Sequence, residues 1–122
     1  VSTQSTGIIF SAEIQDISNN TAILQDHEYA FVQFSVPWCA FTQIAEPEWK
    51  QFADNLKSEK DIIIANINCE IVKDCSDKQK YDVRGFPSYI LFYKGQKVDY
   101  FKPTFPRQQH IFNQWLEQKL EK

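Results

Sequence analysis

The architecture of this chain is decided by residues 29–42, which read Tyr29-Ala30-Phe31-Val32-Gln33-Phe34-Ser35-Val36-Pro37-Trp38-Cys39-Ala40-Phe41-Thr42. The first six residues are nearly continuous in apolar and aromatic side chains, which is typical of a strand buried on both faces. From Phe41 onward the apolar residues recur every three or four positions instead, a spacing that predicts a helix with one core-facing stripe. The stripe consists of Phe41, Ile44, Ala45, Trp49, Phe52, Ala53 and Leu56.

Segments of the same two kinds extend along the rest of the chain. Further strands are expected over residues 14–17, 62–67, 88–93 and 97–101, the last two joined as a hairpin. Further helices are expected over residues 21–25, between Cys75 and Tyr81, and from Pro106 onward. Residues 1–12 are expected to form a loose lead-in. This order predicts one α/β domain over residues 1–122, with a central mixed sheet and helices on both faces.

The composition excludes several classes of protein. The 122 residues are 43% hydrophobic and 24% charged, which indicates a globular domain with a packed core. The net charge of -3 is spread without blocks, so nucleic acid is not an expected partner. No apolar run approaches the ~20 residues that cross a bilayer, so membrane insertion is not expected. No ATP, flavin, nicotinamide or metal motif is visible, so no cofactor is expected, and the lack of Met predicts a piece of a longer product.

Cys39 lies between the end of the buried strand and the start of the predicted helix. The unpaired amides and the positive dipole end of a helix favour a thiolate and lower the pKa of a thiol placed there. The position therefore indicates a reactive cysteine. The alternative is that Cys39 is a small buried hydrophobic residue, which is the commoner role of a single cysteine.

Three landmarks, in order along the chain, resemble thioredoxin-fold domains of the protein disulfide isomerase family. They are Pro37-Trp38-Cys39 after the strand, Pro47-Glu48-Trp49 in the helix, and Val83-Arg84-Gly85-Phe86-Pro87-Ser88 before the hairpin. The resemblance covers about residues 14–120. It implies a thioredoxin fold, thiol-disulfide exchange with polypeptide clients, and a location in the endoplasmic reticulum lumen or elsewhere in the secretory pathway. It also implies further thioredoxin-like domains in the full-length protein.

The resemblance implies roles for individual residues as well. Pro87 would be a cis-proline that faces Cys39 and aligns the backbone of a substrate, and Arg107 occupies the place of a mobile arginine that helps a thiol to ionise. Cys69 and Cys75 would form a structural disulfide, as in some members of the family, while two free thiols are the alternative. A zinc site is not expected, because zinc needs four ligands and the two histidines lie in unrelated segments.

Two departures from the family pattern concern the chemistry. Active members have a second cysteine three residues after the first, where this chain has Thr42. The second thiol normally resolves a mixed disulfide by intramolecular attack, so dithiol exchange is expected to be weak or absent. Gln33 and Asn66 stand where the family places a buried acid and commonly a lysine. A pair of neutral amides would avoid an unpaired buried charge.

These observations leave two interpretations open, and with them the question whether the chain is an enzyme. In the first, Cys39 is a nucleophile that captures clients through one thiol, and Thr42 donates a hydrogen bond to its thiolate. The sequence there is similar to the Cys-Arg-Phe-Ser of a monothiol retention chaperone. In the second, the domain is a redox-silent chaperone or substrate-binding domain of a larger isomerase. In either case an apolar surface for unfolded peptide is expected from Trp38, Phe41, Phe86 and Tyr89.

Overall fold

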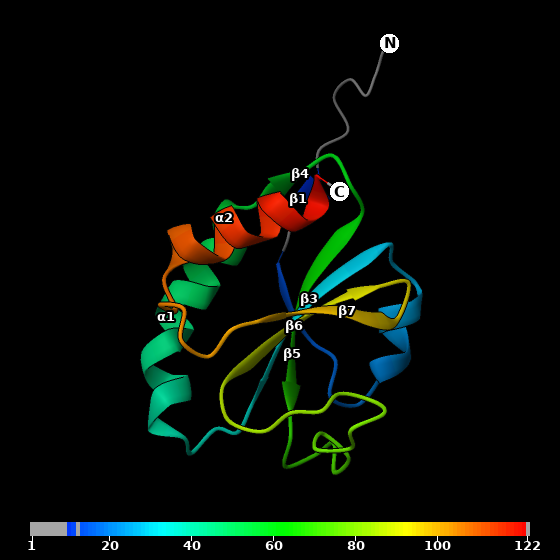
Figure 1. Ribbon diagram of the computed structural model, residues 1–122, viewed down its shortest axis with the longest axis vertical. Helices are drawn as coiled ribbons and strands as arrows, with labels where there is room; N and C mark the ends of the chain where they lie inside the picture. The colour runs from blue at the N-terminus through cyan, green and yellow to red at the C-terminus, as the bar shows by residue number, and fades with distance from the viewer. Residues whose placement is uncertain (1–9, 12, 122) are drawn as a thin grey trace.

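A five-stranded mixed sheet lies at the centre of the computed structural model, which describes residues 10, 11 and 13–121 (Figure 1). Its strands are β2 (Ile14–Asp16), β3 (Tyr29–Ser35), β5 (Ile62–Asn68), β6 (Ser88–Tyr93) and β7 (Gln96–Phe101). They lie in the order β2-β5-β3-β6-β7. The first three strands in this order are parallel, whereas β6 and β7 are antiparallel to their neighbours. The predicted α/β domain with a mixed sheet is confirmed.

The central strand β3 is buried on both faces of the sheet. It pairs in parallel with β5 and antiparallel with β6, so that Phe31 lies between Ile64 and Leu91. Phe31, Val32 and Phe34 have no exposed surface. A strand with two neighbours and two covered faces presents no side to water, which explains its nearly continuous apolar sequence.

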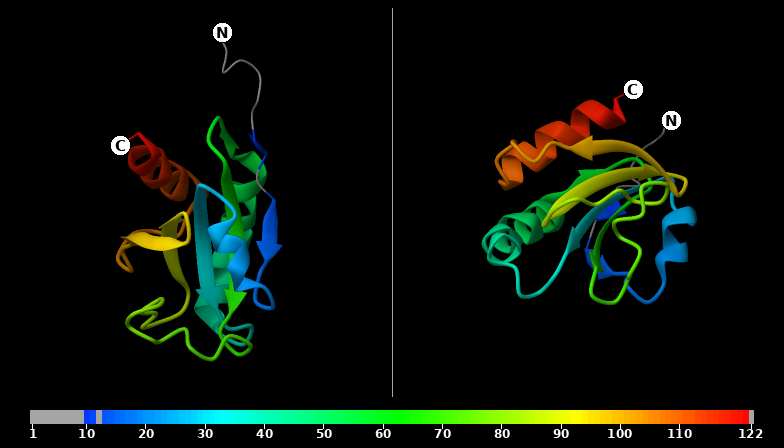
Figure 2. Two further views of the ribbon diagram at one scale, coloured as in Figure 1. Left: turned by 90° about the vertical axis from the view of Figure 1, so that its right-hand side faces the viewer. Right: turned by 60° about the horizontal axis from the view of Figure 1, so that its bottom comes forward.

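Two α-helices, α1 (Ala40–Asn55) and α2 (Gln109–Leu120), cover one face of the sheet (Figure 2). They pack on an aromatic cluster around Phe31, whose ring centroid lies 5.1 Å from that of Trp49 and 5.2 Å from that of Trp115. Such pairs contribute about 0.5–1.5 kcal/mol each beyond the area that they bury. In the part of the chain that the structure describes, no helix combines the length and apolar character needed to cross a bilayer.

The opposite face is covered by the 3-10 helix η1 (Thr21–Gln25) and by the segment that follows β5 (Figure 2). Leu24 of η1 is buried against this face, and Cys75 and Val83 of the later segment are buried beside it. The helices expected on both faces are therefore two α-helices on one side and one short 3-10 helix on the other.

The helix expected between Cys75 and Tyr81 does not form, and this prediction is wrong. The segment consists of turns, and a disulfide between Cys69 and Cys75 closes its first part. Residues 76–80 are all polar, so they offer no apolar stripe with which a helix could pack on the sheet. The backbone folds back instead, because the three N–H groups of residues 80–82 all donate to the carbonyl of Asp77.

Both ends of the chain also differ from the prediction. The last helix begins at Gln109 rather than at Pro106, and the Gln109 N–H donates to a carboxylate oxygen of Glu48 at 2.9 Å. This bond satisfies one of the amides that the first turn of a helix leaves unpaired. Within the expected lead-in, β1 (Phe10–Ser11) pairs antiparallel with β4 (Lys57–Ser58), while residues 1–9 and 12 lie outside the described residues.

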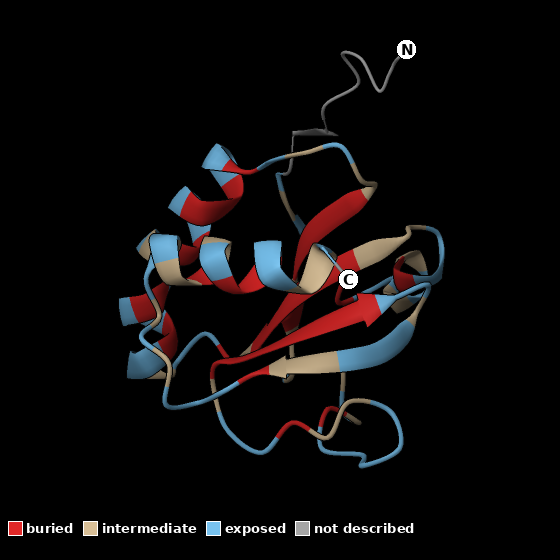
Figure 3. Cartoon of the chain, turned by 45° about the horizontal axis from the view of Figure 1, so that its top comes forward, coloured by how far each residue is buried: buried red, intermediate tan, exposed pale blue. Residues whose placement is uncertain are grey.

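The buried side of α1 differs from the predicted stripe in its first turns. Thr42 and Ala45 face the core there. Phe41 and Ile44 are 63% and 73% exposed, so their assignment to the core is wrong. The buried positions still recur at helical spacing. The first of them is Thr42, whose hydroxyl makes it polar, so a search for apolar residues does not find it. Figure 3 shows the resulting division, with buried residues on the sheet-facing sides of the helices and exposed residues outside.

Replacing both Cys69 and Cys75 by Ala is expected to lower the free energy of unfolding by about 2 kcal/mol, because the bridge restricts the unfolded chain only over a short loop. Urea denaturation of the oxidised parent and the double variant measures the difference. Cys39→Ala, which removes a thiol outside the bridge, is the control. Equal stability of the parent and the double variant, or two free thiols at 69 and 75 by mass spectrometry after exposure to oxidising glutathione buffer, would contradict the prediction.

Candidate active site

Cys39 lies after the carboxyl end of β3, where the chain turns into α1. It is the N-cap residue of the helix, is partly exposed and takes part in no disulfide. Its Sγ lies 3.8 Å from the carbonyl oxygen of Phe86, to which the thiol donates. The peptide bond between Phe86 and Pro87 is cis. The start of α1 and the cis-proline loop, residues 83–88, therefore meet at the sulfur.

The pKa of the Cys39 thiol lies below its ordinary value, chiefly because the backbone N–H of Thr42 hydrogen-bonds to the sulfur. Desolvation acts in the opposite direction. The Thr42 hydroxyl, the Phe41 N–H and the positive charge of Arg107 lower the pKa further. The first turn of α1 thus supplies most of the groups that favour a thiolate, as expected of a helix N-terminus.

The side chain of Thr42 is only 3% exposed, and its hydroxyl has no hydrogen-bond partner among the described residues. The same hydroxyl is nevertheless close enough to the Cys39 sulfur to lower its pKa. A hydroxyl proton rotates about the C–O bond, so it can turn toward the sulfur when the sulfur carries a charge. The hydroxyl therefore donates to the thiolate, which is a strong acceptor, and not to the neutral thiol, which is a weak one.

A groove of about 510 Å³ runs along the cis-proline loop. Phe86, whose carbonyl faces the Cys39 sulfur, contributes to its wall together with Pro87. Arg107, from the segment that precedes α2, lines the same groove. The three segments that carry Cys39, Pro87 and Arg107 therefore converge, which brings together the residues that sequence analysis assigned to one site.

The cis-proline loop is supported by two residues that sequence analysis did not assign to the site. Ser88 Oγ donates to the carbonyl of Gly85 at 2.7 Å, and the Tyr100 hydroxyl donates to Ser88 Oγ at 3.0 Å. Tyr100 lies on β7, the neighbour of the strand that Ser88 begins. No local motif connects Tyr100 with the loop, because their contact arises from the pairing of these two strands.

Neutral polar side chains occupy the core beneath α1. Gln33 is fully buried, and its Nε2 donates to the Tyr89 hydroxyl at 3.1 Å. Asn66 is the neighbour of Gln33 in the register of β3 and β5, but its Oδ1 accepts from Trp49 Nε1 at 2.8 Å. The two amides therefore bond to aromatic partners, and the expected amide pair is wrong. Each amide thus keeps one partner, while Gln33 Oε1 is buried and has no hydrogen-bond partner among the described residues.

Tyr89 belongs to this buried layer and not to the surface. Its side chain is 1% exposed, so its expected contact with unfolded peptide is wrong. Burial raises the pKa of Tyr89 to about 12, although the hydrogen bond from Gln33 acts in the opposite direction. Alternation along β6 explains the burial, because successive residues of a strand point to opposite faces and Tyr89 lies on the same face as the core residue Leu91.

The apolar surface next to Cys39 is made by the first two turns of α1 and the residue that precedes the cysteine. Trp38 is 68% exposed, and Phe41 and Ile44 are exposed as well. Phe86 is partly buried. Trp38 is also held at one end, since its Nε1 donates to a carboxylate oxygen of Glu70 at 2.7 Å. Ile44 was missed as a surface residue because its spacing also fits the core stripe.

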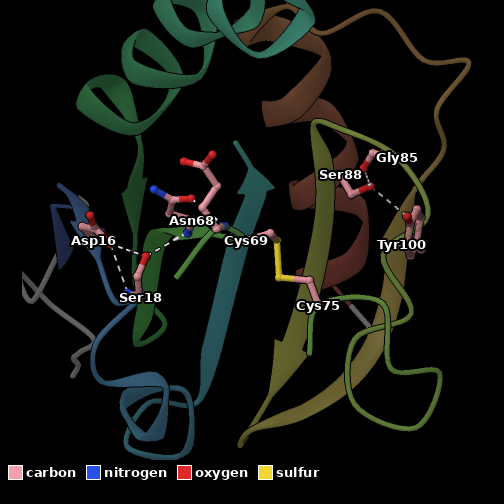
Figure 4. The surroundings of a disulfide bond; sticks show 9 residues. Asp16, Ser18, Asn68, Cys69, Cys75, Gly85, Ser88 and Tyr100 are labelled. Atoms are coloured by element: carbon pink, nitrogen blue, oxygen red, sulfur yellow. Dashed lines mark hydrogen bonds between the residues drawn. A yellow bond between two sulfur atoms is a disulfide. The ribbon is translucent and has the colours of Figure 1, made fainter. Parts of the chain in front are cut away.

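The Cys69–Cys75 disulfide lies between two small hydrogen-bond networks (Figure 4). On one side the Asn68 N–H donates to Ser18 Oγ, and on the other Tyr100 and Ser88 support the cis-proline loop. The Cys69 N–H donates to the carbonyl of Ser35 at 2.8 Å, which ties this segment to the end of β3. Among the described residues no group of three or more His, Cys, Asp or Glu side chains is placed to hold a metal ion.

Comparisons with known proteins agree with this geometry. The model of the thioredoxin family matches residues 11–118. The chain is 36% identical over 79 residues to a probable protein disulfide-isomerase A6 from Medicago sativa, which covers 65% of this chain and 21% of that protein. It is 30% identical over 103 residues to the protein disulfide-isomerase of Oryctolagus cuniculus, covering 84% and 20%. The chain thus spans about a fifth of the length of these relatives.

Solved structures show the same fold. Human ERp44 in its crystal form II superposes with a TM-score of 0.72 at 22% identity, covering 98% of this chain and 32% of that one. A mutant thioredoxin from Halobacterium salinarum NRC-1 superposes with a TM-score of 0.69 at 20% identity, covering 87% and 89%. The predicted thioredoxin fold is therefore confirmed. The chain belongs to the thioredoxin family, and its domain is of the kind found in protein disulfide isomerases.

Proposed function

We propose that the domain captures cysteine-bearing polypeptides through the single reactive thiol of Cys39. The observation that carries this proposal is the arrangement at the sulfur, which sits at the N-terminus of α1, opposite the carbonyl of Phe86 and the cis-proline, with Thr42 where a second thiol would stand. The Cys39 thiolate attacks one sulfur of a client disulfide and forms a mixed disulfide, and the other client sulfur leaves as a thiolate.

The neighbouring residues take defined parts in this step. Pro87 aligns the extended backbone of the client beside Cys39, and Arg107 supports the thiolate through its charge. Trp38, Phe41 and Phe86 contact apolar side chains that flank the client cysteine, since unfolded polypeptides expose such side chains. Ile44 extends the same apolar surface by one helical turn.

Release of the client depends on a thiol from outside the domain. Thr42 has no sulfur with which to attack the mixed disulfide, so the rapid intramolecular step of a dithiol site is missing. Gln33 cannot take up a proton as a carboxylate would, which further disfavours dithiol chemistry. The domain therefore has weak or no oxidoreductase and isomerase activity and holds its clients longer than a dithiol site does.

The setting of the function follows from the relatives. We assign the domain to the lumen of the endoplasmic reticulum or another part of the secretory pathway, as a chaperone-like unit of a protein with further thioredoxin-like domains. Two findings support this assignment: the chain spans about a fifth of its disulfide isomerase relatives, and it carries a Cys69–Cys75 disulfide, which persists in oxidising compartments. A redox-silent binding domain is the competing function, and the three experiments below separate the two.

The pH at which Cys39 becomes half-ionised is expected below the value of about 8.5 for free cysteine. The folded domain favours the thiolate, so this stabilising contribution is present at alkaline pH and is lost as the pH falls through the folded-state pKa. Iodoacetamide alkylation rates from pH 5 to 10 measure the midpoint. In Thr42→Val the midpoint should rise while staying below that of free cysteine, because the backbone N–H of residue 42 remains. A midpoint at or above that of free cysteine in the parent would favour the redox-silent domain.

Mixed disulfides at Cys39 are expected to persist. The parent and Thr42→Cys are each incubated with a disulfide-bonded peptide at pH 7, and the adducts are followed by mass spectrometry. The parent adduct should decay more slowly, since in the variant a second thiol one helical turn away attacks the same bond. Cys39→Ser, which should form no adduct, controls for reaction at other sites. Equal decay in the parent and Thr42→Cys would remove the basis for client retention.

The same Thr42→Cys variant is expected to gain measurable insulin reduction, because the side chain at 42 already lies close to the Cys39 sulfur. Adding Gln33→Glu should raise the rate further by supplying a proton acceptor, at a cost of about 1–3 kcal/mol in unfolding free energy, since Gln33 is fully buried and Asn66 cannot balance the charge. Thr42→Ser is the matched control without a thiol. Folded variants with no activity above that of the parent would show that Cys39 is not a poised nucleophile.

A further inference from the structure

The turn between β2 and η1 carries the sequence Asn19-Asn20-Thr21, in which an asparagine is followed two positions later by a threonine. This is the acceptor pattern for N-linked glycosylation, and it occurs once in the 122 residues. A glycan is bulky and hydrophilic, so a folded domain can carry one only at its surface. The surroundings of Asn19 therefore decide whether the pattern can be used.

Asn19 lies on an exposed turn. It is the third residue of a turn over residues 17–20, in which the Asn20 N–H donates to the carbonyl of Ile17 at 2.9 Å. Its side chain is exposed and forms no hydrogen bond with any described residue. Asn20 is exposed as well, and its φ of -153° and ψ of 66° are not helical. The Asn19 amide is therefore accessible and has no competing partner within the described chain.

The residue before Asn19 anchors this turn to the sheet. Ser18 is only 6% exposed, and its N–H and its hydroxyl both donate to the same carboxylate oxygen of Asp16, at 3.0 and 2.7 Å. The Ser18 hydroxyl also accepts from the Asn68 N–H, at the end of β5, at 2.8 Å (Figure 4). The polar side chain next to Asn19 is thus fully engaged in holding the turn, whereas that of Asn19 is left at the surface.

We propose that Asn19 is a site of N-linked glycosylation. The inference rests on the proposed function in one respect, the assignment to the lumen of the endoplasmic reticulum, where the transferring enzyme acts. The Cys69–Cys75 disulfide supports an oxidising compartment independently of Cys39. The hydroxyl of Thr21, which completes the acceptor pattern, forms no hydrogen bond within the described chain and is partly exposed.

The reaction joins the Asn19 side chain to an oligosaccharide that is linked to a lipid through pyrophosphate. Nδ2 of Asn19 attacks the anomeric carbon of the first sugar, and a C–N bond forms. The C–O bond between that carbon and the pyrophosphate breaks, and the lipid pyrophosphate leaves with the bonding electrons. The nitrogen loses one proton to a base of the transferase. No atom is oxidised or reduced in this step.

The glycan lies on the side of the domain away from the groove at Cys39. Asn19 and Cys39 follow the carboxyl ends of the parallel strands β2 and β3, so both lie at the same edge of the sheet. However, β5 separates these two strands, whereas the cis-proline groove lies on the other side of β3, where β6 and β7 contribute Ser88 and Tyr100 to its wall. The modification therefore leaves the thiol open to a client.

Cell-free translation in the presence of microsomes tests the site. The 122-residue chain, preceded by a cleavable signal peptide, should gain the mass of one glycan, and endoglycosidase H should remove the gain. Asn19→Gln and Thr21→Ala should abolish it, whereas Thr21→Ser keeps the hydroxyl and should retain it. Asn20→Gln is the matched control, because it changes the same exposed turn, removes no side-chain capping bond and leaves the pattern intact.

Protection from added protease verifies that the chain has entered the microsomes. A protected parent without a glycan, or a gain in mass that persists in Asn19→Gln, would overturn the inference. Iodoacetamide should alkylate Cys39 at the same rate before and after endoglycosidase treatment, and slower alkylation with the glycan present would overturn its placement. An unglycosylated chain that captures a disulfide-bonded peptide would overturn this inference alone. A glycosylated chain that captures none would support the inference and overturn the proposed function alone.

Discussion

The site depends on the pairing of β3 along both of its edges. β5 bonds to one edge and β6 to the other, and side chains cover both faces. A slip of one residue would move Phe31 and Phe34 to the wrong faces, so the register is strongly specified. The same register places Ser88, which follows the cis-proline, beside Phe34 near the end of β3. One strand pair thus fixes both halves of the site, the segment that leads to Cys39 and the loop that faces it.

Much of this arrangement could be predicted from the sequence, because the central strands and both long helices have distinct apolar spacing. The contact between Cys39 and Pro87 could be predicted only through the family resemblance, since no local pattern relates residues so far apart in the chain. The errors have two causes. Phe41, Ile44 and Tyr89 are apolar residues whose burial depends on which way the backbone turns them, and composition does not report direction. The helix expected between Cys75 and Tyr81 does not form for another reason, because residues 76–80 are all polar and offer no apolar stripe to pack on the sheet.

The polar groups near the sulfur differ in kind from those in the core. The partly exposed sulfur is surrounded by groups that stabilise negative charge, which are the first amides of α1, the Thr42 hydroxyl and Arg107. Below them the polar groups are neutral, and Gln33, Tyr89, Asn66 and Trp49 bond in two separate pairs. Because a hydrogen bond between neutral groups needs no counter-ion, the core can hold these side chains without the desolvation cost of a buried ion pair. The chemistry is therefore confined to one turn of helix and one loop.

The bond between Gln33 and Tyr89 has a consequence for how the domain passes between its covalent states. A site with a buried carboxylate exchanges protons with its core each time a disulfide opens or closes, so the energy of the folded state changes with every turnover. Here neither partner titrates near neutral pH, since an amide has no proton to release and the pKa of Tyr89 is raised to about 12. Under the proposed function, attachment of a client to the sulfur and its release would therefore leave the charge of this buried layer unchanged.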